Sequence, residues 1–190
     1  MPKTKLISLK EKYIVNLNRL KDIEDLKLRN SEIFNLRKKF FFEYDSLIST
    51  ISNGPHYLKD TKIRAIVEKE IKRFDGELYD LIAYSIMSNH VHLLIDTSIQ
   101  LENELPSEMM LESYVQLDQI MKRIKGPTAV YANRYLGRSG QFWARESYDM
   151  YIRNEKMFAN VISYILDNPV KAGLVANWQD YPGNYLKPHS

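Results

Sequence analysis

The stretch "ELYDLIAYSIMSNHVHLLIDT" (residues 77–97) decides the fold. It contains two runs rich in β-branched and aromatic residues, about 77–87 and 90–97, with only Ser88 and Asn89 between them. So short a connection joins antiparallel strands, because parallel strands need a crossover of a dozen or more residues. The stretch therefore predicts a β-hairpin, and Asn89 suits its turn because asparagine tolerates the left-handed conformation that such a turn often needs.

Alternation along the second predicted strand gives its two faces different characters. Val91, Leu93 and Ile95 share an apolar face, which we expect to pack against helices. His90 and His92 share the other face. Two neighbouring imidazoles can bind one divalent cation through one nitrogen each, provided that a third ligand is near. The alternative is a half-solvated sheet face without a metal.

Further elements flank the hairpin on both sides. Helical periodicity or strand-like alternation marks each of them. The predicted helices are 31–51, 61–74, 109–125, 128–136 and 155–167, and the predicted additional strands are 13–18 and 142–152. The order β-α-β-β-α-β-α is that of the split β-α-β, ferredoxin-like arrangement plus one helix. The sequence thus predicts an α+β fold, an antiparallel sheet with helices on one face and an extra C-terminal helix.

Length and composition favour one globular domain over residues 1–190. The chain is long enough to bury a core, and 44% of its residues are hydrophobic. The absence of cysteine excludes a disulfide framework and a thiolate metal site, and it fits a reducing compartment. The start shows no secretory signal, and no apolar run is long enough to span a bilayer. We therefore expect a cytoplasmic protein that does not enter a membrane.

Basic residues gather between positions 122 and 171, where nine Lys or Arg accompany four acidic residues. Aromatic residues are interleaved with them, which suits single-stranded nucleic acid, because phosphates attract the cations and bases stack on the rings. The alternative is an ordinary solvated basic surface, with cations suited to a helix end and a tryptophan in the core. The candidate DNA-contacting residues are Lys122, Arg123, Lys125, Arg134, Arg138, Trp143 and Arg145.

The predicted helix at 155–167 places a tyrosine beside an asparagine. Tyr164 falls about 110° from the middle of the apolar stripe of this helix, at its boundary. A boundary tyrosine is also typical of plain amphipathic packing. Asn168 neighbours Tyr164 if the helix continues that far. Pro169 opposes that continuation, and Asn168 can instead cap a turn that begins at the proline. The apolar stripe consists of Met157, Phe158, Val161, Ile162, Ile165 and Leu166.

These residues suggest phosphodiester chemistry. A phenol, with an ordinary pKa near 10, is a weak nucleophile and benefits from a cation that polarises the phosphoryl oxygens and stabilises the leaving 3′-oxygen. His90, His92 and the Asn168 amide oxygen would make an open site suited to Mg²⁺ or Mn²⁺, and the imidazoles favour Mn²⁺. Attack by Tyr164 would leave a covalent 5′-phosphotyrosine and a free 3′-hydroxyl, so that strands could be cut and rejoined.

Three stretches carry a resemblance to a known family. They are "LKDTKIRAIVEKEIKRFDGELYDLIAYSIMSNHVHLL", "MKRIKGPTAVYANRYLGRSGQFWARESYDMYIRNEK" and "VISYILDNPVKAGLV". In this order and spacing, over most of residues 58–175, the chain resembles the REP-associated tyrosine transposases, which are single-tyrosine HUH (His-hydrophobe-His) endonucleases. The pair "NHVHLL" and "YILDNPVKAGLV" is the specific part of the match.

The resemblance implies a ferredoxin-like fold, a divalent metal, and cleavage and transfer of single-stranded DNA that carries a hairpin. By position, His90 and His92 match the metal ligands, Val91 the hydrophobe, Tyr164 the nucleophile and Asn168 the third ligand.

The resemblance is uneven along the chain. Residues 1–57 match less clearly, and residues 176–190 are interpreted as a C-terminal tail. Ser88 stands where the family usually has proline, and we expect it to loosen the turn.

Three functions remain in competition. The first is an active nuclease and strand transferase acting on REP-like DNA hairpins, as a monomer or homodimer, and the presence of all four site residues favours it. The second is a DNA-hairpin-binding protein without chemistry. The third is a structural-metal or regulatory domain, in which Tyr164 is dispensable. Tyr148 and Tyr151 are alternative nucleophiles, but both lie on a predicted strand and lack an asparagine four residues later.

Overall fold

The computed structural model describes residues 2–49, 55–101, 113–144 and 147–188. The chain divides into two compact units, and each is described by itself. The helical unit comprises Met1–Pro55 and Ser147–Ile152, and the α/β unit comprises His56–Glu146 and Arg153–Ser190. The boundary after Pro55 lies close to residue 58, where the family resemblance begins.

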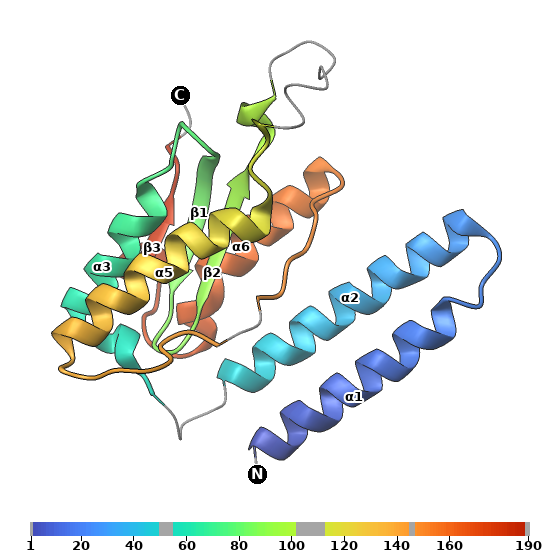
Figure 1. Cartoon of the computed structure of the whole chain (residues 1–190), viewed down its shortest axis with the longest axis horizontal. Helices are drawn as coiled ribbons and strands as arrows, with labels where there is room; N and C mark the ends of the chain where they lie inside the picture. Colours follow the sequence, from blue (N-terminus) through green and yellow to red (C-terminus); the bar gives the residue numbers. More distant parts are fainter. Residues whose placement is uncertain (1, 50–54, 102–112, 145–146, 189–190) are drawn as a thin grey trace. The chain divides into compact units, whose positions relative to one another are not determined.

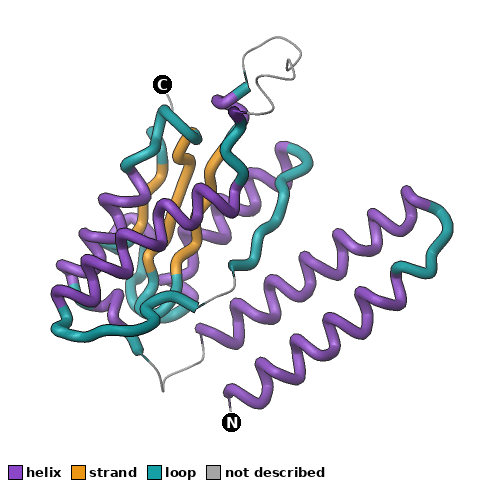
Figure 2. Tube along the Cα trace, viewed as in Figure 1, coloured by secondary structure: helices purple, strands orange, loops and turns teal. Residues whose placement is uncertain are grey.

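The helical unit is built on a pair of helices, α1 (Pro2–Leu20) and α2 (Leu26–Ser49), which Figures 1 and 2 show as long coils. α2 begins before the predicted residue 31 because Asp25 caps it, with Oδ1 accepting from the backbone N–H of Lys27 at 2.8 Å and of Leu28 at 3.0 Å. Within the pair, the rings of Tyr13 and Phe40 lie 4.4 Å apart.

The predicted strand at 13–18 is wrong, because these residues lie inside α1. A six-residue window shows alternation, but over the whole element the partly buried apolar side chains recur every three or four residues, which is the helical spacing. These side chains are Leu6, Leu9, Tyr13, Leu17 and Leu20.

The α/β unit contains an antiparallel sheet in the order β2-β1-β3. β1 (Asp80–Ile86) and β2 (Val91–Asp96) form the predicted hairpin around Ser88 and Asn89. β3 (Asn184–Leu186) was not predicted, since it lies in the segment interpreted as a tail. It pairs with the other edge of β1.

The α+β class is confirmed, but the four-stranded ferredoxin-like order is not observed. The first predicted strand is helical, and of the described residues in the range 142–152 none belongs to a strand. The third strand of the sheet comes instead from the C-terminal segment.

Helices cover both faces of the sheet. α3 (Thr61–Lys72) and α5 (Leu117–Tyr135) pack on the face that carries Val91, Leu93 and Ile95, which we call the core face. α6 (Glu155–Lys171) lies on the opposite face, which we call the α6 face (Figure 1). The predicted assignment of side chains to the two faces of β2 is therefore confirmed. The buried core behind the core face includes Ile63, Val67, Ile71, Leu81, Tyr84, Ile86, Ile120 and Ile124.

α5 runs without a break through Gly126 and Pro127, so the prediction of two helices on either side of this pair is wrong. Proline removes one backbone hydrogen bond and crowds the preceding turn. Here the buried stripe continues past it, with side chains at every fourth position, and packing outweighs the cost. That stripe is Ile120, Ile124, Thr128 and Ala132. Residues 109–112 of the predicted helix lie outside the described residues.

α6 begins where Asn154 Oδ1 accepts a hydrogen bond from the Met157 N–H at 2.9 Å. It continues through Pro169 and ends before Gly173, whose positive φ of 67° suits a residue without a side chain. The predicted end at Asp167 was thus too early by one turn. None of the helices in the described part of the chain is long and apolar enough to span a membrane.

Candidate metal and nucleophile site

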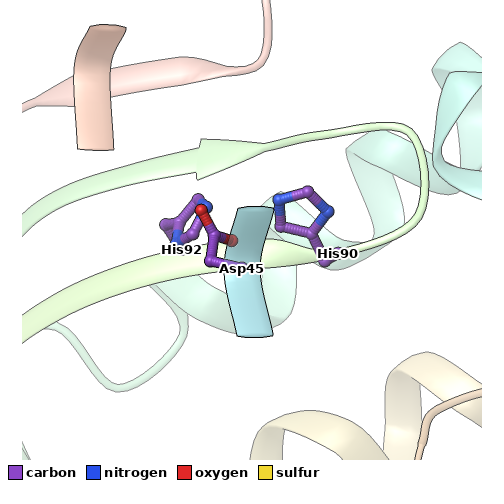
Figure 3. Close-up of side chains that lie close together, drawn as sticks. All are labelled: Asp45, His90 and His92. Atoms are coloured by element: carbon purple, nitrogen blue, oxygen red, sulfur yellow. The ribbon is translucent and has the colours of Figure 1, made fainter. Parts of the chain in front are cut away.

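His92 is the second residue of β2 and His90 directly precedes the strand; Figure 3 shows both rings. The ring centroids are 4.9 Å apart and the ring planes nearly perpendicular. His92 is 7% exposed and His90 is partly buried. Asp45, which Figure 3 also labels, is a residue of α2 in the helical unit. The two imidazoles are thus close enough to direct one nitrogen each at a common cation.

The connection between β1 and β2 runs from Met87 to His90. Two-residue hairpin loops favour turn types that need a positive φ, whereas four-residue loops are most often built around a type I turn. No residue of the described chain other than glycine has a positive φ, so Asn89 does not adopt the left-handed conformation that asparagine tolerates in such turns. Contacts to the segment before α3 hold the turn. Ser88 Oγ lies 2.8 Å from His56 Nδ1, and the Ser88 carbonyl accepts from the Leu58 N–H at 3.1 Å.

Tyr164 projects from α6 toward β2. Its ring stands edge-on to the ring of His92, with centroids 5.7 Å apart. Tyr164 is partly buried, in agreement with its predicted place at the boundary of the apolar stripe. The Nζ atom of Lys171, further along the same helix, lies 4.9 Å from the centre of the Tyr164 ring. The phenol therefore lies between an imidazole and a cation.

Asn168 lies within α6, one turn after Tyr164, so the alternative that it caps a new turn at Pro169 is wrong. It is only 7% exposed. Its Nδ2 donates to the Tyr164 carbonyl at 2.9 Å, which fixes the amide, because only the nitrogen can donate to a carbonyl. Oδ1 is therefore the atom that this side chain can offer to a cation.

These donor atoms fit a divalent metal. Imidazole nitrogen and amide oxygen are both accepted by Mn²⁺, and Mg²⁺ favours the oxygen. His92 is fixed by its place opposite Ser85 in the strand pairing, and Asn168 by its bond to the helix backbone. The candidate ligands His92 and Asn168 thus lie on β2 and α6, two elements of the same unit.

Most predicted DNA-contacting residues lie on or near α5, on the other face of the sheet from Tyr164. Arg123 and Arg134 are exposed there. Lys122 pairs with Asp118 at 2.9 Å, and the Lys125 Nζ donates to the Ala144 carbonyl at 2.9 Å. The structure therefore does not gather these residues around the histidines.

Arg138 and Trp143 follow α5. Arg138 donates to the Gln141 carbonyl at 3.2 Å and stacks over the ring of Tyr57. The indole of Trp143 packs against the core cluster and donates to Thr128 Oγ1 at 2.7 Å, which favours the core alternative. Arg145 lies outside the described residues.

The alternative nucleophiles belong to the helical unit. The ring of Tyr148 packs against Tyr44 at 4.1 Å and Phe40 at 5.2 Å, and Tyr151 is 73% exposed. Only Tyr164, of these three tyrosines, shares a unit with both histidines.

Sequence reasoning missed two neighbours of the site. Lys171 lies on the same face of α6 as Tyr164. The sequence pattern predicted that the helix ends at Asp167, and a shared face could be predicted only for a helix that continues past Pro169. The side chain of Asn89 contacts the ring of His90. Its place next to His90 in the sequence is the feature from which this contact could have been predicted.

Comparisons with known proteins give limited similarity. No protein-family model matches the chain, and no solved structure matches it. A relative from Haemophilus influenzae, whose name assigns it provisionally to the REP-associated tyrosine transposases, is 29% identical over 104 residues. The match covers 55% of this chain, and the chain spans 57% of the length of that relative.

Proposed function

We propose that the chain is a metal-dependent single-strand DNA nuclease and strand transferase of the REP-associated tyrosine transposase type. The contact between the rings of His92 and Tyr164, at 5.7 Å, carries the proposal, because it brings a nucleophile beside a candidate metal ligand. The name of the similar Haemophilus influenzae protein supports the same reading. The substrate would be single-stranded DNA folded into a REP-like hairpin.

Tyr164 would attack the phosphorus of one phosphodiester. The bond between Tyr164 Oη and phosphorus forms, and the bond between phosphorus and the 3′-oxygen breaks. The phenol gives up its proton and the 3′-oxygen takes one up, which leaves a 5′-phosphotyrosine and a free 3′-hydroxyl. Lys171 lies over the Tyr164 ring and would favour the negative charge that develops on the phenol oxygen.

His90, His92 and Asn168 would hold Mg²⁺ or Mn²⁺, which supplies positive charge to the phosphoryl oxygens and the leaving 3′-oxygen. The chain itself contributes orientation. The strand pairing positions His92, and the bond from Nδ2 to the Tyr164 carbonyl positions the Asn168 amide one turn from the nucleophile. Ligand and nucleophile therefore keep a constant spacing on α6.

The covalent intermediate explains why the same site can join strands. The phosphotyrosine bond conserves the energy of the broken phosphodiester, so a 3′-hydroxyl from another strand can attack it. The reverse of the first step then releases Tyr164 and completes strand transfer.

The test is a search for the covalent adduct. The protein is incubated with Mn²⁺ and a pool of labelled single-stranded DNA hairpins, denatured, and separated by size. Peptide mapping of the labelled band is expected to place the DNA on Tyr164, and sequencing of the attached strands would identify the substrate. Tyr164→Phe, which removes only the hydroxyl oxygen, is expected to abolish the adduct.

Tyr148→Phe and Tyr151→Phe are the matched controls and are expected to form the adduct normally. Binding of hairpins by the unaltered protein without any adduct would instead favour the binding protein without chemistry. Mn²⁺ binding with neither DNA binding nor an adduct would favour a structural-metal domain.

A further inference from the structure

The side chain of Asn89 contacts the ring of the histidine that follows it. The distance between Asn89 Oδ1 and His90 Nδ1 is 2.7 Å, which is within hydrogen-bonding range. A carbonyl oxygen only accepts hydrogen bonds, so this contact is a hydrogen bond when Nδ1 carries the hydrogen. In a neutral imidazole the other nitrogen, Nε2, then has the lone pair.

A metal binds the imidazole nitrogen that has the lone pair, and the hydrogen bond made by the other nitrogen decides which one that is. We infer that Asn89 is a positioning residue, whose side-chain oxygen holds His90 in the Nδ1–H tautomer and so presents Nε2 to the cation. The consequence for metal binding rests on the proposed function. The inference about the tautomer rests on the contact between Asn89 and His90 and does not require the proposed function.

The ordinary reason for asparagine in a tight turn does not apply here. Asparagine is favoured in turns because it tolerates the left-handed conformation, but Asn89 has a negative φ. Tolerance of that conformation therefore does not account for Asn89. In this turn it contacts the ring of His90.

Hydrogen bonds on both sides of the turn hold the side chains of Asn89 and His90 next to each other. The Met87 N–H donates to the His90 carbonyl at 2.9 Å, which closes the hairpin. The carbonyl and hydroxyl of Ser88 bond to Leu58 and His56 on the neighbouring segment. With the backbone on both sides of Asn89 held, its side chain is positioned to accept from the ring beside it.

Nitrogen NMR tests the tautomer without reference to activity. The full-length, metal-free protein is labelled with ¹⁵N-histidine, and long-range proton–nitrogen spectra are recorded near pH 7.5, with His90→Gln used to assign the signals. We expect His90 to carry its hydrogen on Nδ1. In Asn89→Ala the hydrogen should move largely to Nε2, whereas Asn89→Asp, which keeps an acceptor oxygen, should retain the Nδ1–H form. The backbone amide spectrum of each variant serves as the control for the fold.

Mn²⁺ titration, followed by the electron paramagnetic resonance of the free ion, tests the consequence. Loss of the partner of a metal-binding histidine typically weakens affinity about 10–100-fold, so we expect Asn89→Ala to bind Mn²⁺ that much more weakly. Asn89→Asp should bind at least as tightly as the unaltered protein. A purely structural role in the turn would not produce this difference together with the tautomer change.

An Nε2–H tautomer of His90 in the unaltered protein would overturn the inference, as would an unchanged tautomer in Asn89→Ala. This part of the test needs no metal and succeeds or fails independently of the proposed function. If the tautomer is as expected but His90→Ala does not weaken Mn²⁺ binding, the proposed metal site fails. If His90→Ala weakens binding and Asn89→Ala does not, the positioning role of Asn89 is refuted.

Discussion

The ring of His92 on β2 stands edge-on to the ring of Tyr164 on α6, with 5.7 Å between the centroids. The two residues belong to elements that are far apart in the sequence. They meet because His92 faces away from the core behind β1 and β2, and α6 covers that face. A candidate ligand and a candidate nucleophile are thereby brought together by packing.

Lys171 is expected to assist the chemistry through its charge. Replacement by Met should slow formation of the DNA adduct about 3–10-fold, a modest effect because the ammonium is exposed and screened by solvent. Lys171→Arg, which keeps the charge, should react at nearly the normal rate. Single-turnover adduct formation at low and high salt measures this. An equal rate for the Met and Arg variants would exclude a role for the charge.

Asn168 is expected to act both on the helix and on the metal. Asn168→Ala removes the bond to the Tyr164 carbonyl and should lower the free energy of unfolding by about 1 kcal/mol. Asn168→Asp cannot donate to that carbonyl and should be less stable still without metal, since its charge is buried. Mn²⁺ should then raise the melting temperature of the Asp variant and not that of the Ala variant. Equal responses to Mn²⁺ in the two variants would exclude Asn168 as a ligand.

Thr128 and Trp143 are expected to be coupled in the core. Thr128 is fully buried, and its hydroxyl accepts from the Trp143 indole N–H at 2.7 Å. Thr128→Val keeps the shape but leaves this donor without its acceptor, so the free energy of unfolding should fall by about 1–2 kcal/mol. Urea unfolding of the single and double variants measures the coupling. In the Trp143→Phe background the same change should cost about 1 kcal/mol less, and identical costs in both backgrounds would refute the coupling.

The stability of the fold is expected to fall in alkali. Burial raises the pKa of Tyr79 and of Tyr84 above the ordinary value near 10, and a hydrogen bond with Glu68 adds to the effect at Tyr84. Above about pH 10 the unfolded chain releases these protons while the folded chain retains them. The contribution of the two tyrosines to the free energy of unfolding is therefore fully present below that pH and is lost as the pH rises further. Urea unfolding between pH 8 and pH 11 measures the slope.

Tyr84→Phe is the control for this pH dependence. It removes one titrating group, so the free energy of unfolding should fall less steeply above about pH 10 than in the unaltered protein. Tyrosine absorbance that titrates fully near pH 10 with the fold intact would contradict the raised pKa values.

The local sequence pattern was enough to predict the β1–β2 hairpin and the two faces of β2. It also predicted the central residues of the helices α2, α3 and α6. In each case the pattern extends over enough residues to distinguish a period of two from one of 3.6. The same reasoning failed at residues 13–18, where a short window matched both periods. It also singled out the four candidate residues, because His90 and His92 were predicted to share a strand face and Tyr164 and Asn168 a helix face.

Tertiary structure decided what local pattern could not. β3 is too short to be recognised without its partner β1, and α5 and α6 continue through Pro127 and Pro169 because buried side chains on both sides outweigh a lost backbone bond. Asn89 has a negative φ, and Ser88 beside it bonds to His56 and Leu58 on a segment distant in the sequence. Local pattern was thus enough to propose His90, His92, Tyr164 and Asn168 as candidate site residues. The contact between His92 and Tyr164 forms because α6 packs on β2. Periodicity reveals which residues share a face of one element, but it cannot reveal which distant elements pack together.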